Sequence, residues 1–222
     1  MRLLAAAGTV LLTAHAWVHP GITNSKDDLE RLATLAKSDA EPWKSAYEAF
    51  AADEHSAKGY ELKGLCPYVA RTKESATTVC MTDFAHDAGA ALQQSLMWII
   101  TDDEAYLDNS LEILNEWGKT LKKVNGSDAQ LAAGLSGSNF VNAAEIVRHM
   151  SDKWAEDDIE TFSNMLSTAI YPPAEQHIPS EEQSVPWIAN WGTAGAKLVL
   201  AAGVFLENQT AIDTAKELML HS

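Results

Sequence analysis

The residues best suited to take part in binding or catalysis are Asn190 and Trp191, which lie just before a long apolar stretch. Residues 198–206 are apolar nearly all the way round a helix, which predicts that this helix is buried. A carboxamide and an indole at the mouth of such a helix need partners. Either Asn190 caps the helix and Trp191 fills the core, or both face a cleft together with a second indole, Trp187.

Other polar side chains that could serve a cleft are spread along the chain. His86 is a candidate for proton transfer, although a solvated or core-satisfied histidine is the commoner reading. Asn139 and Asn142 lie three residues apart and either line the cleft or bond helix ends. Arg148 and Lys197 are possible cation partners for an anionic ligand, against the more frequent surface role of such residues.

The elements that must position these residues are helices. Apolar residues recur with helical spacing, and no run alternates as a strand would. Two early helices are marked by Leu29 to Leu35 and by Trp43 to Phe50. Further helices are expected at 83–101, 104–124, 128–150 with a weak point at 134–137, 156–170, from 190 onward, and 209–220.

The pattern of a helix, a short turn and a second helix recurs along the chain. This pattern predicts antiparallel helical hairpins packed side by side. The fold class is therefore all-α, and the lack of a strict repeat favours an irregular (α/α) toroid over a regular solenoid. The short turn at 101–103 is expected on one rim. The long loops at 55–80 and 172–185 are expected on the other rim, where a cleft would form.

The length and the net charge of the chain limit its possible domain organisation and binding partners. The chain has 222 residues, which suits one domain with a sizeable core. Its formal net charge of −15 disfavours nucleic acid and anionic membrane surfaces as partners. If the substrate is a polyanion, the protein must gather its few cations locally.

The first 16 residues have the pattern of a signal peptide: Arg2, an apolar run too short to span a bilayer, and Ala14-His15-Ala16 as a cleavage site. A buried first helix is the alternative. Residues 17–222 are then one secreted, extracellular domain, and no later segment has the length and apolarity of a membrane span.

The secretory interpretation extends to two further features. The two cysteines, Cys66 and Cys80, are expected to form a disulfide. They make a poor zinc site because no histidine pair is near them in the sequence. Asn125 and Asn208 begin acceptor patterns for N-glycosylation.

A set of short motifs, none specific alone, follows a recognisable order over nearly all of residues 17–222. They are His19-Pro20-Gly21, Pro42-Trp43, the block from Asp87-Ala88 through Trp98, Thr101-x-Asp103-x-x-Tyr106, Ile113-Leu114-Asn115-x-Trp117, Ala143-Ala144-Glu145-Ile146-x-Arg148, and Asn190-Trp191 followed by Gly203-Val204-Phe205-Leu206. In this order the chain resembles the alginate-lyase-domain family of polysaccharide lyases. The resemblance implies an (α/α) toroid and β-elimination on a uronate polysaccharide such as alginate or glucuronan.

The same resemblance implies a role for Asn190 and an incomplete toroid. In the family the matching asparagine neutralises the substrate carboxylate. Family members are longer, so this chain resembles their N-terminal half, and their catalytic tyrosine normally comes from the half that follows. Some of these lyases have a histidine directly after the asparagine, where this chain has Trp191.

β-Elimination sets clear chemical requirements. The proton beside a carboxylate is barely acidic until the carboxylate charge is neutralised by an amide or a cation. A tyrosine or histidine then removes that proton and protonates the leaving oxygen. No metal or cofactor is formally required. Asn190 suits neutralisation of the carboxylate, whereas Trp191 cannot transfer a proton. The expected partner of the protein is an anionic polysaccharide.

Two other functions stay open, as does the oligomeric state. A glycoside hydrolase on the same architecture would use two carboxylates across a cleft. Asp83 and Asp87 are the visible pair, but adjacent turns of one helix would flank a bond poorly. A non-catalytic carbohydrate-binding protein, or a half-enzyme, would suit the exposed indoles and the missing tyrosine.

Overall fold

The computed structural model describes residues 17–72, 78–175 and 190–221, and these are mostly helical. The predicted all-α class is therefore confirmed. The longest elements are α3 (Met81–Thr101), α4 (Glu104–Thr120), α6 (Ser138–Met150), α7 (Glu156–Met165), α9 (Asn190–Phe205) and α10 (Gln209–His221). The predicted signal peptide and Trp187 fall outside the described residues.

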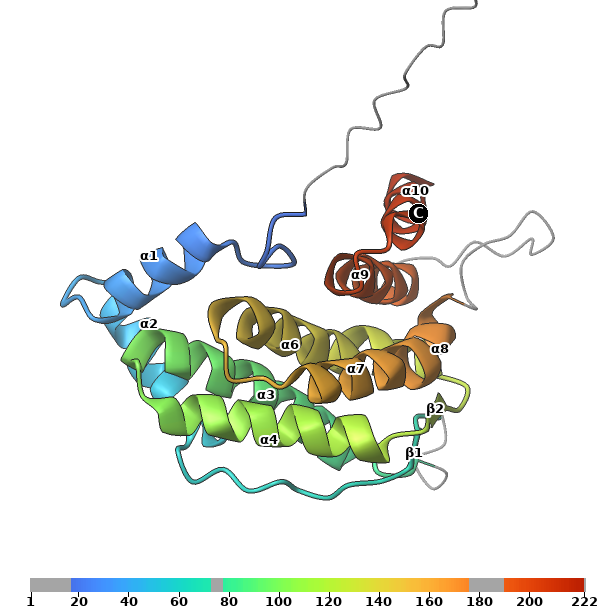
Figure 1. The fold of residues 1–222 in the computed structure, drawn as a ribbon, viewed down its shortest axis with the longest axis horizontal. Helices are drawn as coiled ribbons and strands as arrows, with labels where there is room; N and C mark the ends of the chain where they lie inside the picture. Colours follow the sequence, from blue (N-terminus) through green and yellow to red (C-terminus); the bar gives the residue numbers. More distant parts are fainter. Residues whose placement is uncertain (1–16, 73–77, 176–189, 222) are drawn as a thin grey trace, which may run out of the picture.

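The helices form a layered stack of hairpins (Figure 1). Helix α3 packs against α4 and α6, α6 packs against α9, and α9 packs against α10. Helix α7 covers α4. Asp103 caps α4 by accepting from the backbone N–H of Ala105, and the two residues Asp102 and Asp103 form the predicted short turn after α3.

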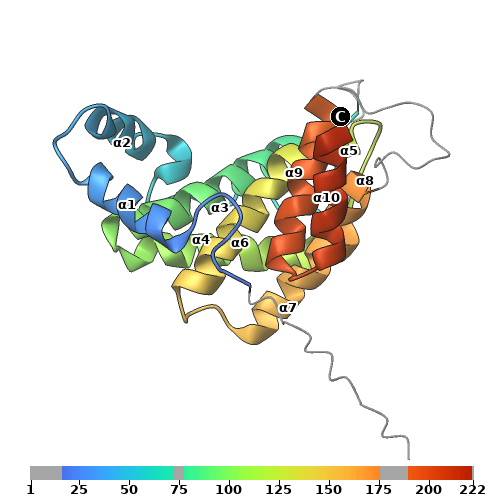
Figure 2. The ribbon, with the colours of Figure 1, turned by 90° about the horizontal axis from the view of Figure 1, so that it is seen from above.

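A smaller hairpin stands at one end of the stack (Figure 2). It consists of α1 (Lys26–Ala36) and α2 (Trp43–Ala51), with α1 resting on α3. Ser25 and Asp28 form a capping box that fixes the start of α1. The 3₁₀ turn η1 (Glu54–Ser56) follows α2 and also packs on α3.

The segment between η1 and α3 is tied down by pairing and by a disulfide. Strand β1 (Tyr68–Ala70) pairs in parallel with β2 (Lys123–Asn125), in the register Val69 to Val124. Cys66 and Cys80 are bridged, with their Cα atoms 6.4 Å apart, which confirms the predicted disulfide. The bridge joins this segment to the residue that immediately precedes α3.

The two short strands explain why the predicted helix 104–124 was too long. Helix α4 ends at Thr120, and the backbone N–H groups of Lys122 and Lys123 donate to the carbonyl of Pro67 instead of continuing the helix. Val124 is buried in the core from its strand position. Tertiary pairing therefore overrides the helical pattern at this end.

The predicted weak point at 134–137 is a change of helix type. The chain passes from α5 (Ala129–Leu131) through the π-helical segment η3 (Ala132–Gly137) into α6. A Cβ on Gly134 would lie 2.2 Å from the carbonyl oxygen of Ala194. Glycine is therefore needed here because η3 and α9 touch backbone to backbone.

The prediction that the helix from Glu156 ends before Tyr171 was wrong. It continues through the π-helical segment η4 (Leu166–Ile170) into α8 (Tyr171–Glu175). Pro172 and Pro173 lie in α8 directly after the π-helical segment, so the helical run passes through both prolines.

Candidate functional site

The site predicted at Asn190 lies at the beginning of the described part of α9. Asn190, Thr193 and Lys197 are exposed, and their spacing places them on one face of the helix. Trp191 is partly exposed beside them. The opposite faces of α9 are buried through Ala194, Gly195, Ala196, Leu198, Val199, Ala201, Ala202, Gly203 and Phe205. The predicted buried helix with a polar mouth is thus confirmed.

Small residues hold this helix close to its neighbours. A Cβ on Gly195 would lie 2.5 Å from Nε2 of Gln130, which is itself buried. A Cβ on Gly203 would lie 2.8 Å from the Ile212 side chain on α10. Together with the contact at Gly134, these approaches fix α9 between η3 and α10. The exposed stripe is therefore carried on a rigid support, which is what a binding site requires.

Lys197 gives the stripe a positive charge. Among the described residues it forms no ion pair, whereas Lys44, Lys58, Lys119 and Lys153 are each paired with a carboxylate. In a chain of net charge −15, Lys197 places a positive charge two helical turns from the exposed amide of Asn190. Such a stripe can attract and hold a carboxylate.

Asn142 and Arg148, predicted to bind substrate, hold the fold together instead. Asn142 is 4% exposed, its Nδ2 donates to the carbonyl of Ser138 at 2.7 Å, and its Oδ1 accepts from the hydroxyl of Thr23. The guanidinium of Arg148 donates to the carbonyl of Phe205 at 3.1 Å and covers its ring. Asn139 is partly exposed on α6 and keeps its predicted role open.

His86 belongs to a half-exposed cluster on α3 and η1. Its Nδ1 lies 3.1 Å from Nε2 of His55 and 3.6 Å from a carboxylate oxygen of Glu54. Nδ1 of His55 lies 2.7 Å from Oδ1 of Asp53. The backbone N–H and the ring of His55 hold the pKa of the Asp53 carboxyl below its ordinary value. The sequence reasoning found His86 but not the companions that surround it.

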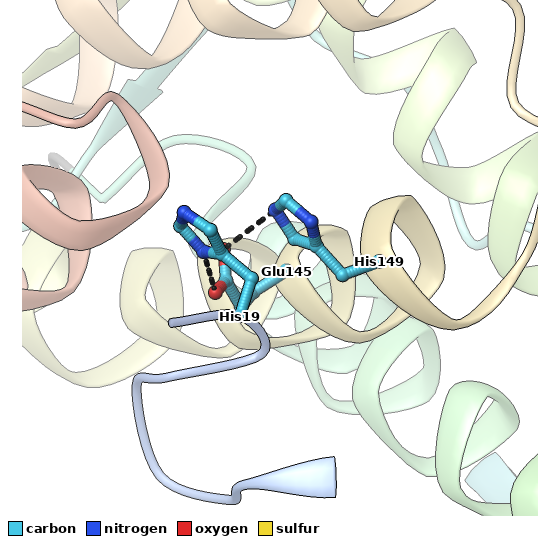
Figure 3. A group of neighbouring side chains, drawn as sticks. All are labelled: His19, Glu145 and His149. Atoms are coloured by element: carbon cyan, nitrogen blue, oxygen red, sulfur yellow. Dashed lines mark hydrogen bonds and ion pairs between the residues drawn. The ribbon is translucent and has the colours of Figure 1, made fainter. Parts of the chain in front are cut away.

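A second histidine cluster was missed altogether (Figure 3). Nδ1 of His19 lies 2.7 Å from Oε1 of Glu145, and the backbone N–H of Gly21 donates to the same oxygen at 2.9 Å. Nε2 of His149 faces the other carboxylate oxygen at 3.7 Å. Glu145 is 1% exposed, so this carboxylate anchors the N-terminal segment on α6.

Burial sets the electrostatics of this cluster. Desolvation lowers the pKa of His149 below its ordinary value, and the adjacent Glu145 opposes that shift only in part. The rings of His19 and His149 stack with centroids 4.0 Å apart and planes within 5°. Glu145 and His149 are four residues apart on a buried helix, the one local sign that the sequence offered.

Asp87, one of the two carboxylates that the hydrolase alternative would use, is enclosed in the core. Asp87 is fully buried and accepts hydrogen bonds from the Tyr60 hydroxyl, the Lys63 backbone and the Trp117 indole, at 2.7, 3.1 and 2.8 Å. A carboxylate enclosed in this way cannot flank a glycosidic bond, which agrees with the expectation that this pair would serve a hydrolase poorly.

The two predicted glycosylation positions are both accessible. Asn125 is exposed in β2, and its side-chain oxygen accepts from the backbone N–H of Gly126. Asn208 is exposed just before α10, and its side-chain oxygen accepts from the backbone N–H of Ala211. Their modification stays a prediction.

Comparison with known proteins identifies the family of the chain. Among the helices that the structure describes, none combines the length and the apolar character needed to cross a membrane. No curated protein sequence matched the chain. The alginate lyase family matches residues 28–221, nearly the whole chain, and its members are built on an (α/α) toroid. The chain therefore belongs to the alginate lyase family.

Proposed function

We propose that the protein is a secreted polysaccharide lyase that acts by β-elimination on a uronate polymer such as alginate or glucuronan. The observation that carries the proposal is the exposed stripe of Asn190, Thr193 and Lys197 on the otherwise buried helix α9. Membership of the alginate lyase family supports the reaction class. The disulfide between Cys66 and Cys80 supports an oxidising, extracellular location.

In this proposal Asn190 donates its amide N–H to the uronate carboxylate at the cleavage point. Charge that develops on the carboxylate during proton removal is then stabilised by a donor already in position. Lys197 adds longer-range attraction for the anionic chain. Trp191 lies next to Asn190 and offers an aromatic face for a sugar ring.

Proton transfer falls to another side chain. Tyr60 is held by Asp87, and burial above all raises its pKa, which disfavours a role as base. Burial also raises the pKa of Tyr171 to about 12. Tyr68 is 59% exposed, and His86 is partly exposed, so both are accessible to substrate. We propose Tyr68 and His86 as the candidates for proton transfer. The variants Tyr68→Phe and His86→Gln would show which of the two is needed for activity.

The test is the appearance of ultraviolet absorbance from unsaturated uronate ends, on alginate and on glucuronan. Asn190→Ala is expected to lower the rate by a few hundredfold, about 3–4 kcal/mol of transition-state stabilisation. Asn164→Ala is the matched control, because Asn164 is an exposed helical asparagine on α7. Trp191→Ala is expected to weaken substrate binding mainly.

Each other outcome has a definite meaning. If the wild-type chain is active and Asn190→Ala leaves the rate unchanged, the assignment of Asn190 is wrong and the residue only begins the helix. Reducing ends without the absorbance would refute elimination. Binding of polyuronate without either signal would identify a carbohydrate-binding protein in place of an enzyme.

A further inference from the structure

The half-exposed cluster of Glu54, His55 and His86 has the arrangement of a metal site. One ligand atom from each residue lies within 4.8 Å of the other two. Zn²⁺ binds imidazole nitrogen at about 2.0–2.1 Å in tetrahedral geometry, so its ligand atoms stand roughly 3.3 Å apart. The observed separations are 3.1 Å between the two histidines and 3.6 Å from His86 to Glu54. A small movement would bring all three onto one ion.

Asp53 prepares His55 to be a ligand. A carboxylate only accepts hydrogen bonds, so the Nδ1 atom 2.7 Å from Asp53 must carry the proton. In the neutral ring, Nε2 then presents its lone pair toward His86. A carboxylate behind a histidine is the usual device that orients a metal-binding imidazole and raises its basicity. Asp53 and Glu54 also bring two negative charges to the place where a cation would bind.

The backbone that carries His55 is held rigidly on α3. The buried Gln94 donates from Nε2 to the carbonyls of His55 and Ala57, at 2.6 and 2.9 Å. The hydroxyl of Ser56 donates to Gln93 at 2.7 Å. Because η1 is attached to the same helix that carries His86, the two imidazoles keep their relative position without an ion. Such preorganisation is what a metal site needs.

The buried cluster of Figure 3 also has three ligand atoms within 4.8 Å of one another, but its rings are oriented differently. The rings of His19 and His149 are stacked and nearly parallel, at 5°. Lone pairs in two parallel ring planes cannot meet at one ion. The rings of His55 and His86 are instead tilted by 37°. Their side chains are 19% and 37% exposed, which leaves an ion a path from solvent.

We propose that Glu54, His55 and His86 bind a divalent transition-metal ion, with Zn²⁺ as the best-matched candidate. His55 Nε2, His86 Nδ1 and the Glu54 carboxylate supply three ligands, and a fourth position faces solvent. Two imidazoles and one carboxylate with an open position form a ligand set that proteins use for Zn²⁺. The ion would use only Nδ1 of His86, so Nε2 of that ring would carry the proton.

The test is a calorimetric titration of the full-length, disulfide-bonded chain with Zn²⁺, repeated with Co²⁺ to read tetrahedral coordination from its visible spectrum. One ion per chain is expected. His55→Ala and His86→Ala should abolish binding, and Asp53→Asn should weaken it about 10- to 100-fold. Circular dichroism of each variant checks that the helices remain.

His149→Gln is the control, because it changes a histidine of the buried cluster and should leave Zn²⁺ binding intact. Binding lost in His149→Gln but kept in His86→Ala would overturn the proposal, as would a chain that binds no Zn²⁺. Either result would leave the contact between His55 and His86 as a hydrogen bond alone. Lyase activity does not enter these measurements, so their outcome is separate from that of the proposed function.

Discussion

The two histidine clusters are built from the same residue types but differ in burial and in ring geometry. His19, Glu145 and His149 meet under the N-terminal segment, with the carboxylate 1% exposed and the rings stacked. Glu54, His55 and His86 meet at the surface, with the carboxylate 62% exposed and the rings tilted. In the first cluster the carboxylate also accepts from a backbone N–H, that of Gly21. In the second cluster the carboxylate of Glu54 is largely exposed to solvent. Identical side chains therefore serve anchoring in one place and ligand binding in the other.

The largest expected effect is the loss of the buried carboxylate. Glu145→Ala leaves the backbone N–H of Gly21 and the ring of His19 without their partner in a partly buried site. We expect unfolding to become easier by about 3 kcal/mol. For a domain of this size that corresponds to a fall in Tm of roughly 6–12 °C.

Glu160→Ala on α7 is the control for this change, because Glu160 is exposed. It should change the free energy of unfolding by no more than about 0.5 kcal/mol. Equal Tm values for the two variants would contradict the anchoring role of Glu145.

The next effect is a dependence of stability on pH. Burial lowers the pKa of His149 in the folded state, so the unfolded chain binds more protons at slightly acidic pH. The stability contributed by keeping His149 neutral is present above the unfolded pKa of about 6.5 and is lost as pH falls from there toward the lowered folded value.

Thermal melts between neutral and mildly acidic pH check this expectation. The fall in Tm on acidification should be smaller in His149→Gln than in the wild-type chain. A fall of the same size in both would show that His149 does not carry the effect.

The smallest expected effect lies in the exposed cluster. Glu54→Gln removes a largely exposed charge, so without added metal the free energy of unfolding should change by less than about 0.5 kcal/mol. Denaturant unfolding measures this difference. A loss comparable to that of Glu145→Ala would erase the distinction between the two clusters.

The sequence could predict the helices because their periodicity is local. The buried character of α9 and the turn after α3 followed from neighbouring residues alone, and the disulfide followed from the even number of cysteines and the predicted secretory route. The pairing of β1 with β2 did not, since Val69 and Val124 are brought together by the tertiary fold. The prolines of α8 were mistaken for a helix end because proline usually ends a helix, whereas here the run continues from a π-helical segment into α8.

Candidate site residues can be related to one another from the sequence where one helix carries them. Asn190 and Lys197 share a face of α9, so helical spacing alone relates them. The assignments of Asn142 and Arg148 to substrate binding depended on side-chain direction, which the sequence does not record. His55 and His86 are 31 residues apart, and His19 and Glu145 are 126 apart, so no spacing rule could have joined them.

The anchoring of His19 and Gly21 on Glu145 has a consequence for the order of folding. The N-terminal segment leaves the ribosome first, yet its partners on α6 follow more than a hundred residues later. His19 also faces Glu207, just beyond α9, at 3.5 Å between Nε2 and the carboxylate. During vectorial synthesis this segment must therefore wait undocked until α6 has followed it, and its contact with Glu207 forms later still.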